Sequence, residues 1–173
     1  NTMCIACHTT GFDKRYDAIR GQLTFADTHL PDILEQVRCS LPIELELNQL
    51  IDSLHMQDEN RQRVLDACRR AAEPFIVITH GTDTMAETAG VLGRIFASGE
   101  AELAGKRIVL TGAMVPYSVS GSDALFNLGS AIAAAQLVPA GVYIAMNGRC
   151  FPWHAVRKDR TRGVFEGEPL QTP

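Results

Sequence analysis

The chain has 173 residues, and 16 Lys and Arg stand against 20 Asp and Glu, which gives a formal net charge of −4 at pH 7. This length suits one domain, which buries roughly two thirds of its unfolded surface without help from metals or disulfides. The acidic balance argues against a nucleic-acid partner, which would need a basic face. No apolar run approaches the roughly 20 residues of a membrane helix, so we expect no membrane partner.

The first half of the chain alternates strand and helix patterns. Residues 3–8 form a short apolar run typical of a buried strand, and 30–39 predict a helix with Pro31 in its first turn. Residues 43–47 alternate apolar and acidic side chains, the pattern of a half-buried strand. Residues 57–72 predict a charged amphipathic helix, and the apolar run 75–79 predicts another strand.

The second half continues the alternation, with predicted helices at 84–97 and 122–136 and predicted strands at 107–111 and 141–146. Strands that are apolar on both faces and separated by helices indicate a parallel sheet covered on both sides. We therefore expect a single α/β domain with a doubly wound, mostly parallel sheet, a three-layer Rossmann-like or flavodoxin-like fold.

Cysteine and histidine positions bear on redox state and metals. Five cysteines, an odd number, with no visible signal peptide predict free thiols in a reducing cytoplasm. Cys4 and Cys7 form a C-x-x-C, but on a strand they would point to opposite faces, so we expect neither a disulfide nor a metal pair. The five histidines have no metal-ligand spacing, and no G-x-G-x-x-G or Walker loop occurs, so we expect no metal and no cofactor.

Small and hydroxylated residues follow the predicted strands. Parallel sheets of this kind bind ligands at the carboxyl ends of their strands. The segments at those ends are Thr9-Thr10-Gly11, Asp52-Ser53, Gly81-Thr82-Asp83, Gly112-Ala113-Met114 and Asn147-Gly148. Such a rim can bring hydroxyls and backbone amides close to a small polar ligand.

The segment from His80 to Thr84 has two interpretations. Thr84 and Glu87 fit the S/T-x-x-E capping box, so Thr82, Asp83 and Thr84 could do no more than cap the next helix. Three consecutive Thr-Asp-Thr residues exceed what capping needs, which leaves a catalytic or binding role open.

Several motifs in order decide between these interpretations. They are His80-Gly-Thr-Asp-Thr84, the strand end Val109–Pro116, the helix start Ser122–Leu128, the turn Met146-Asn147-Gly148 and the loop Leu50–Met56. Together they resemble the asparaginase/glutaminase family of threonine amidohydrolases, although Ala124 stands where the family has Gly and His55 where it has Asp. The resemblance covers nearly all of residues 1–173 but matches only the amino-terminal domain of the two-domain enzymes. It therefore implies one asparaginase amino-terminal-type domain, with the carboxy-terminal domain absent.

The resemblance implies hydrolysis of L-asparagine to L-aspartate and ammonia by a threonine nucleophile through a covalent acyl-enzyme, with weaker L-glutaminase activity. It assigns catalytic roles to Thr82, Asp83, the loop tyrosine Tyr16 and Lys158, twelve residues after Met146. A lysine between a carboxylate and a threonine hydroxyl can position or activate a nucleophile. The substrate-binding residues that it implies are Asp52, Ser53, Thr82, Asp83 and Ala113.

The first glycine loop departs from the family pattern. The family would read T-T-G-G-T-F, whereas this chain runs directly from Gly11 to Phe12. Either the printed sequence skips a Gly and a Thr, or the deletion is real and the protein is a non-catalytic or impaired amino-acid-binding homologue. We favour the first interpretation, because the residues around the gap keep the pattern. Thr10, the nearest hydroxyl, is the candidate nucleophile.

The short length also bears on assembly. Without a second domain, the surface that this domain normally covers would expose apolar area. We therefore expect a homo-oligomer, a dimer or tetramer, whose only other partner is the small-molecule substrate L-asparagine.

Overall fold

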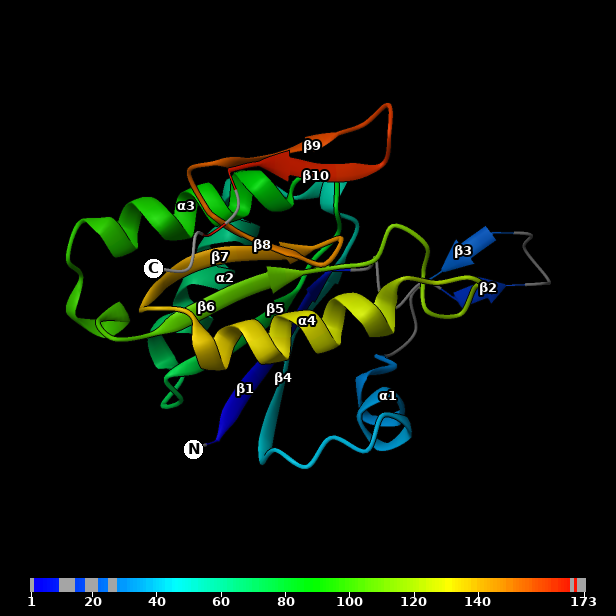
Figure 1. Ribbon diagram of the computed structural model, residues 1–173, viewed down its shortest axis with the longest axis horizontal. Helices are drawn as coiled ribbons and strands as arrows, with labels where there is room; N and C mark the ends of the chain where they lie inside the picture. The colour runs from blue at the N-terminus through cyan, green and yellow to red at the C-terminus, as the bar shows by residue number, and fades with distance from the viewer. Residues whose placement is uncertain (1, 10–14, 18–21, 25–27, 169, 171–173) are drawn as a thin grey trace.

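The structure is a computed structural model that describes residues 2–9, 15–17, 22–24, 28–168 and 170. A six-stranded sheet in the order β4-β1-β5-β6-β7-β8 forms its centre (Figure 1). The strands are β1 (Met3–Thr9), β4 (Ile43–Ile51), β5 (Phe75–Thr79), β6 (Arg107–Thr111), β7 (Gly141–Met146) and β8 (Arg149–Pro152). The first five run parallel, and β8 runs antiparallel to β7. Counted in chain order, the parallel strands follow 2-1-3-4-5, the flavodoxin-like order, which confirms the predicted fold class.

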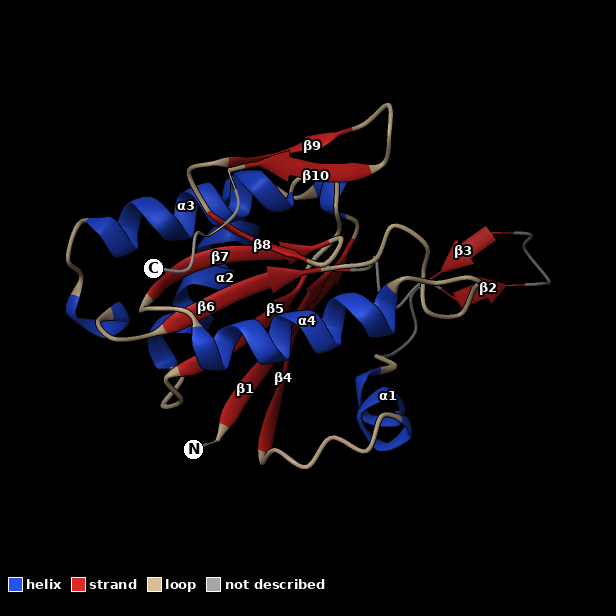
Figure 2. Ribbon diagram, viewed as in Figure 1, coloured by secondary structure: helices blue, strands red, loops and turns tan. Residues whose placement is uncertain are grey.

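Helices cover both faces of the sheet, as Figure 2 shows. Helices α2 (Asp58–Arg70) and α3 (Met85–Ala97) lie on one face, and α1 (Leu30–Gln36) and α4 (Ala124–Leu137) lie on the other. Successive strand residues point to opposite faces, so Ile76 and Ile78 of β5 join the first core while Phe75 and Val77 join the second. Because both faces of the central strands β5, β6 and β7 are buried, these strands are almost entirely apolar, which is why they were recognisable in the sequence.

Two predicted elements differ from the structure in detail. Helix α1 ends at Gln36 rather than at residue 39, because Arg38 takes a left-handed conformation with φ 53° that a helix cannot continue. Strand β4 lies at the sheet edge, and its Leu45 and Leu47 side chains are exposed. The expected half-buried face is therefore wrong at these two leucines, because no described element covers them.

Three strands after β7 were not predicted. A two-residue turn at Asn147-Gly148, with φ 55° and 74°, joins β7 to β8. Positive φ at both positions is the signature of a type I′ hairpin, and Asn-Gly is its preferred sequence. Strands β9 (Val156–Asp159) and β10 (Val164–Gly167) then form a separate hairpin that packs beside α3 (Figure 1). This hairpin brings its residues to the edge of the sheet.

The remaining elements are short. Strands β2 (Arg15–Asp17) and β3 (Gln22–Thr24) pair with each other, and Figure 1 shows them beyond the carboxyl ends of the sheet strands. Two 3-10 turns, η1 (Ser53–His55) and η2 (Ala101–Leu103), precede α2 and β6. Among the described residues, no helix is long and apolar enough to cross a membrane.

Candidate active site

The parallel strands all end at one edge of the sheet, and the chain reverses its direction of winding between β1 and β5. Ligand sites of doubly wound sheets form at such a switch point. Asp52 and Ser53 follow β4, Thr82 and Asp83 follow β5, and Ala113 follows β6, so these predicted residues share the edge.

The side chains of two predicted residues are not described by the structure. Thr10 lies outside the described residues. Tyr16 lies in β2, where its backbone pairs with Leu23, and its side chain is not among the described parts. Their predicted roles remain predictions.

Lys158 of β9 joins the turn after β5. Its Nζ donates to Thr82 Oγ1 and to Asp83 Oδ1, both at 2.8 Å. The Lys158 side chain is 11% exposed and that of Asp83 is 34% exposed. The Thr82 residue is also buried. Lys158 thus forms one partly buried polar cluster with two adjacent residues that lie 75 and 76 positions before it in the chain.

This arrangement decides what the Thr82 hydroxyl can do. An ammonium only donates hydrogen bonds, so the Thr82 oxygen accepts from Lys158 and its own hydrogen is left to donate elsewhere. A hydroxyl that accepts from a cation is polarised and becomes a stronger donor. Asp83 keeps its second oxygen, Oδ2, without a partner among the described residues. The cluster therefore presents one polarised hydroxyl and one anionic oxygen to a ligand.

Thr84 connects this turn to the neighbouring loop. Its Oγ1 donates to the Ser53 carbonyl at 2.8 Å, and it makes no side-chain capping bond to α3. Glu87 does not complete a capping box either, because it binds Arg61 at 3.0 Å. The capping interpretation is therefore wrong for Thr84, whose side chain joins the loops that follow β4 and β5.

Ser53 and Asp52 hold the other side of this connection. Ser53 is buried and begins η1, and the Asp52 carboxylate accepts from the Leu54 N–H at 3.0 Å. Asp52 therefore fixes the local turn, as a loop-orienting residue would.

His80 supports the turn that carries Thr82 and Asp83. It is fully buried, its Nδ1 lies 2.7 Å from the Gly81 carbonyl and its Nε2 lies 2.8 Å from Thr88 Oγ1. Since a carbonyl only accepts, Nδ1 carries the hydrogen, and Nε2 accepts from the Thr88 hydroxyl. Burial lowers the pKa of the His80 imidazole to about 4, so the ring stays neutral and holds the Gly81-Thr82 turn.

The loop after β6 packs directly against this turn. A Cβ at Gly112 would lie 2.3 Å from the His80 carbonyl oxygen and 3.4 Å from Thr82 Cγ2, so only glycine allows the approach. The Asp123 carboxylate accepts from the Met114 and Val115 N–H groups at 3.1 and 2.9 Å. Ala113, the predicted substrate contact, is buried within this fixed loop.

Arg160 was not predicted from the sequence. Its Nη2 donates to the Asp83 carbonyl at 3.2 Å, which places a second cation beside the Lys158–Asp83 pair. In the sequence it is one of several basic residues in a run, and nothing local distinguishes it from Arg157 or Arg162.

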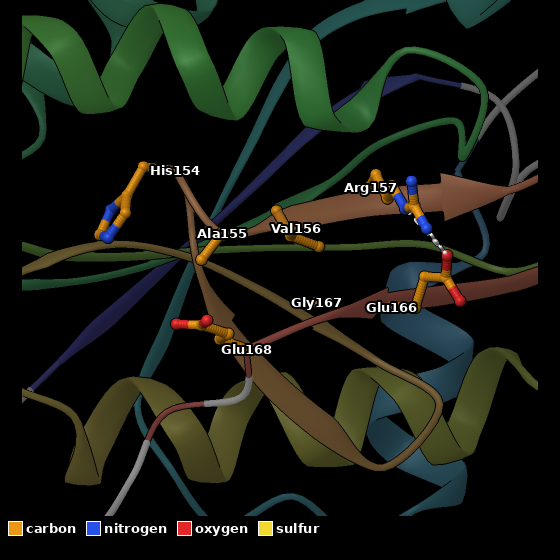
Figure 3. A pocket seen from close by; sticks show the side chains of 7 residues that line it. All are labelled: His154, Ala155, Val156, Arg157, Glu166, Gly167 and Glu168. Atoms are coloured by element: carbon orange, nitrogen blue, oxygen red, sulfur yellow. Dashed lines mark hydrogen bonds and ion pairs between the residues drawn. The ribbon is translucent and has the colours of Figure 1, made fainter.

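A cavity with a volume of about 780 Å³ lies at the end of the hairpin where β9 begins and β10 ends (Figure 3). Its lining includes His154, Glu168 and the pair Arg157–Glu166, whose Nε and Oε1 are 2.8 Å apart. None of the predicted site residues lines it. Because Thr82, Asp83 and Lys158 are absent from its lining, this cavity is separate from their cluster.

Burial makes three of the cysteines poor nucleophiles. Cys4, Cys39, Cys68 and Cys150 are free. Burial raises the pKa of Cys4 and Cys150 to about 11 and that of Cys68 to about 12, which keeps these thiols protonated. No group of three or more His, Cys, Asp or Glu side chains in the described part of the chain could hold a metal.

Known proteins resemble this chain in sequence and in fold. The family described as "Asparaginase, N-terminal" matches residues 9–166. A glutaminase-asparaginase of Acinetobacter glutaminasificans is 36% identical over 106 residues, which is 60% of this chain and 29% of that protein. An L-asparaginase of Thermococcus kodakarensis is 30% identical over 125 residues, 71% of this chain and 37% of the relative.

The fold likeness extends over the whole chain. The solved structure of the thermostable L-asparaginase from Thermococcus kodakarensis aligns with a TM-score of 0.81 and 23% identity, over 100% of this chain and 57% of that one. In sequence, the chain matches roughly a third of the length of the two curated relatives. Since the family match covers most of its residues, the chain belongs to the asparaginase family and corresponds to its amino-terminal domain.

Proposed function

We propose that this chain hydrolyses L-asparagine to L-aspartate and ammonia through a threonine acyl-enzyme, with weaker activity on L-glutamine. The observation that carries the proposal is the contact of the Lys158 ammonium with both Thr82 Oγ1 and Asp83 Oδ1 at 2.8 Å. Membership of the asparaginase family and the names of the two relatives support the choice of substrate.

In the proposed reaction the nucleophile is Thr10, as the sequence predicts, with Tyr16 helping to activate it. Its Oγ attacks the side-chain carbonyl carbon of asparagine, and the hydroxyl proton passes to the departing NH₂, which leaves as ammonia. Water then attacks the acyl carbon of the aspartyl ester. Its oxygen replaces the threonine oxygen there, and one of its protons returns to the threonine oxygen. Each half-reaction regenerates the charges of the Lys158–Asp83 pair.

The cluster contributes proton handling and orientation. The polarised Thr82 hydroxyl can donate to the reacting group, and Lys158 can stabilise negative charge that develops on that hydroxyl oxygen. Asp83 keeps Lys158 in place. Backbone N–H groups in the turns around Thr82 and Ala113 are candidates for the oxyanion site.

The substrate's charged end needs complementary partners. The open Oδ2 of Asp83 suits the α-ammonium group, and the hydroxyl and N–H donors near Ser53 suit the α-carboxylate. Thr84 sets the spacing of these two partners, because its hydroxyl joins the Ser53 carbonyl to the turn that carries Asp83.

The proposal is tested by ammonia release from asparagine and glutamine. Asp83→Asn should lower the rate by about 10² to 10⁴ and leave the melting curve cooperative. Asp32→Asn, an exposed carboxylate on α1, is the matched control and should keep full activity. A fully active Asp83→Asn protein would overturn the assignment of the cluster.

The alternative is an amino-acid-binding homologue without a nucleophile. Quenching a reaction with asparagine and measuring intact mass distinguishes the two, because an acyl-enzyme adds an aspartyl group and binding adds nothing covalent. Peptide mapping of residues 8–14 would show whether Thr10 carries it. Asparagine binding without ammonia release or a mass shift would favour the alternative.

We also propose that the chain assembles as a dimer or tetramer and acts in the cytoplasm. The exposed Leu45, Leu47, Phe126 and Leu137 side chains support self-association. The free thiols of the described cysteines suit a reducing compartment. Sedimentation velocity at micromolar concentration tests the assembly, and a stable monomer would contradict it.

A further inference from the structure

A buried amide lies between the loop after β6 and the hairpins that follow β7. Asn127, on α4, is fully buried. Its Nδ2 donates to the Gly112 carbonyl at 3.0 Å and to Asp123 Oδ2 at 2.7 Å, and its Oδ1 accepts from the Asn147 N–H at 3.2 Å. The last donor is a backbone N–H, so the orientation of the Asn127 amide is unambiguous. Asn127 therefore ties the Asn147 turn to the loop that carries Ala113.

Asn147 carries this connection further. Its side-chain Oδ1 accepts from the Phe165 N–H of β10 at 2.8 Å. Its backbone has φ 55°, a conformation that asparagine tolerates better than most residues. The turn residue thus uses its main chain toward α4 and its side chain toward β10.

Phe165 lies directly opposite Lys158 in the β9–β10 ladder. Because the Phe165 N–H points to Asn147, it points away from β9, so the two residues form a non-hydrogen-bonded pair. Cα atoms of such a pair are about 4.5 Å apart, and their side chains lie close together on one face. On that face Phe165 is buried in the core and Lys158 reaches Thr82 and Asp83.

We propose that Asn147 is a positioning residue for Lys158. Its side-chain carbonyl, fixed through Asn127, holds β10 in register with the core and thereby sets the Lys158 ammonium against Thr82 and Asp83. Asn127 also fixes the Gly112–Val115 loop through the Gly112 carbonyl and Asp123. The Lys158 side and the Ala113 side of the proposed substrate site are therefore held by the same buried residue. This inference rests on the proposed function for its effect on catalysis, but the placement of Lys158 can be measured without it.

The energetic reason lies in the size of the hairpin. A two-stranded hairpin is marginally stable by itself and takes its position from what it is attached to. Without the Asn147 carbonyl, the Phe165 N–H would lose its partner in a part-buried place, and the hairpin would shift to hydrate it. A displacement of about 1 Å at a catalytic group can cost about a hundredfold in rate.

Two variants separate the side chain from the turn. Asn147→Gly keeps a backbone suited to positive φ and removes the acceptor, whereas Asn147→Asp keeps an acceptor oxygen. We expect Asn147→Gly to lower kcat for asparagine by about tenfold to a hundredfold with little change in KM. Asn147→Asp should retain most of the wild-type rate. Asn48→Ala is a distant control: it removes a β4 amide that donates to the Arg63 carbonyl of α2, and it should stay within about twofold of wild type.

Two readouts do not depend on turnover. Hydrogen exchange at the Phe165 amide should quicken by at least about tenfold in Asn147→Gly and stay near the wild-type rate in Asn147→Asp. Amine labelling of Lys158, mapped by mass spectrometry, should quicken in Asn147→Gly alone. If wild type releases no ammonia, the proposed function fails, while these two measurements still decide the placement of Lys158. Unchanged Phe165 exchange and Lys158 labelling in Asn147→Gly, or equal damage in both variants, would overturn the inference.

Discussion

The Lys158 ammonium and the Asp83 carboxylate meet at 2.8 Å, although 75 positions of sequence separate them. The Lys158 side chain is only 11% exposed, so its charge is largely removed from water. Exposed ion pairs contribute little to stability, but removing one partner of a largely buried pair leaves a charge poorly solvated. The two residues are therefore coupled, and a change in either should affect the other.

Replacing Lys158 tests this coupling on the catalytic side. Lys158→Met keeps the aliphatic stem but removes the donor to Thr82 and Asp83, so we expect ammonia release to fall by about 10² to 10⁴. Arg157→Met is the control, because Arg157 lies next to it on β9 with an 80% exposed side chain. Comparable rates in the two variants would exclude a role for Lys158 in the reaction.

The Thr84 hydroxyl should matter more for substrate binding than for turnover. Thr84→Val removes the bond to the Ser53 carbonyl while keeping the shape of the side chain, which loosens the spacing between the Ser53 and Asp83 loops. We expect KM for asparagine to rise by about tenfold and stability to fall by about 1 kcal/mol. Steady-state kinetics with urea unfolding measure both. Ser98→Ala, which also removes a hydroxyl-to-carbonyl bond, is exposed and should leave KM unchanged.

His80 should make folding stability depend on pH. Its folded pKa, about 4, lies below the ordinary value of 6.5, so the unfolded chain binds a proton there that the folded chain does not. Stability from this group is complete above pH 6.5 and is lost as pH falls toward 4, by about 3 kcal/mol in total. Urea unfolding of wild type and His80→Gln across this range measures the effect, which should be smaller in the variant. The exposed His154→Gln should behave like wild type, and equal slopes in all three would refute the prediction.

Two helix glycines should respond oppositely to alanine. At Gly93 of α3 a Cβ would lie 2.1 Å from the Trp153 ring, so Gly93→Ala must displace the indole and should cost about 1 to 3 kcal/mol. At Gly129 of α4 a Cβ would meet nothing within 4 Å, so Gly129→Ala should stabilise the protein by about 0.5 to 1 kcal/mol through helix propensity. Thermal melts give both signs. A stabilised Gly93→Ala would contradict the packing of Trp153 against α3, and a destabilised Gly129→Ala would contradict the open space at Gly129.

The parallel sheet and its four helices were predictable because hydrophobic periodicity is a local property of the chain. The strands β5, β6 and β7 are almost entirely apolar, and their ends indicated where Thr82, Asp83 and Ala113 would gather. The family motifs then connected Lys158 to the same site. The four-residue strands β8, β9 and β10 gave no such signal, since each is short and interrupted by charged residues, although Asn147-Gly148 marked a turn.

What the tertiary structure alone decided is which polar groups meet. The sequence contained Thr84, His80, Asn147 and Lys158 as residue types at known positions, and its local patterns favoured helix capping for Thr84. Hydrogen bonds from Thr84 to Ser53, from Phe165 to Asn147 and from Lys158 to Asp83 span 31, 18 and 75 positions. Such contacts depend on how the layers pack and how the hairpins turn, and no local pattern encodes a distance between strands.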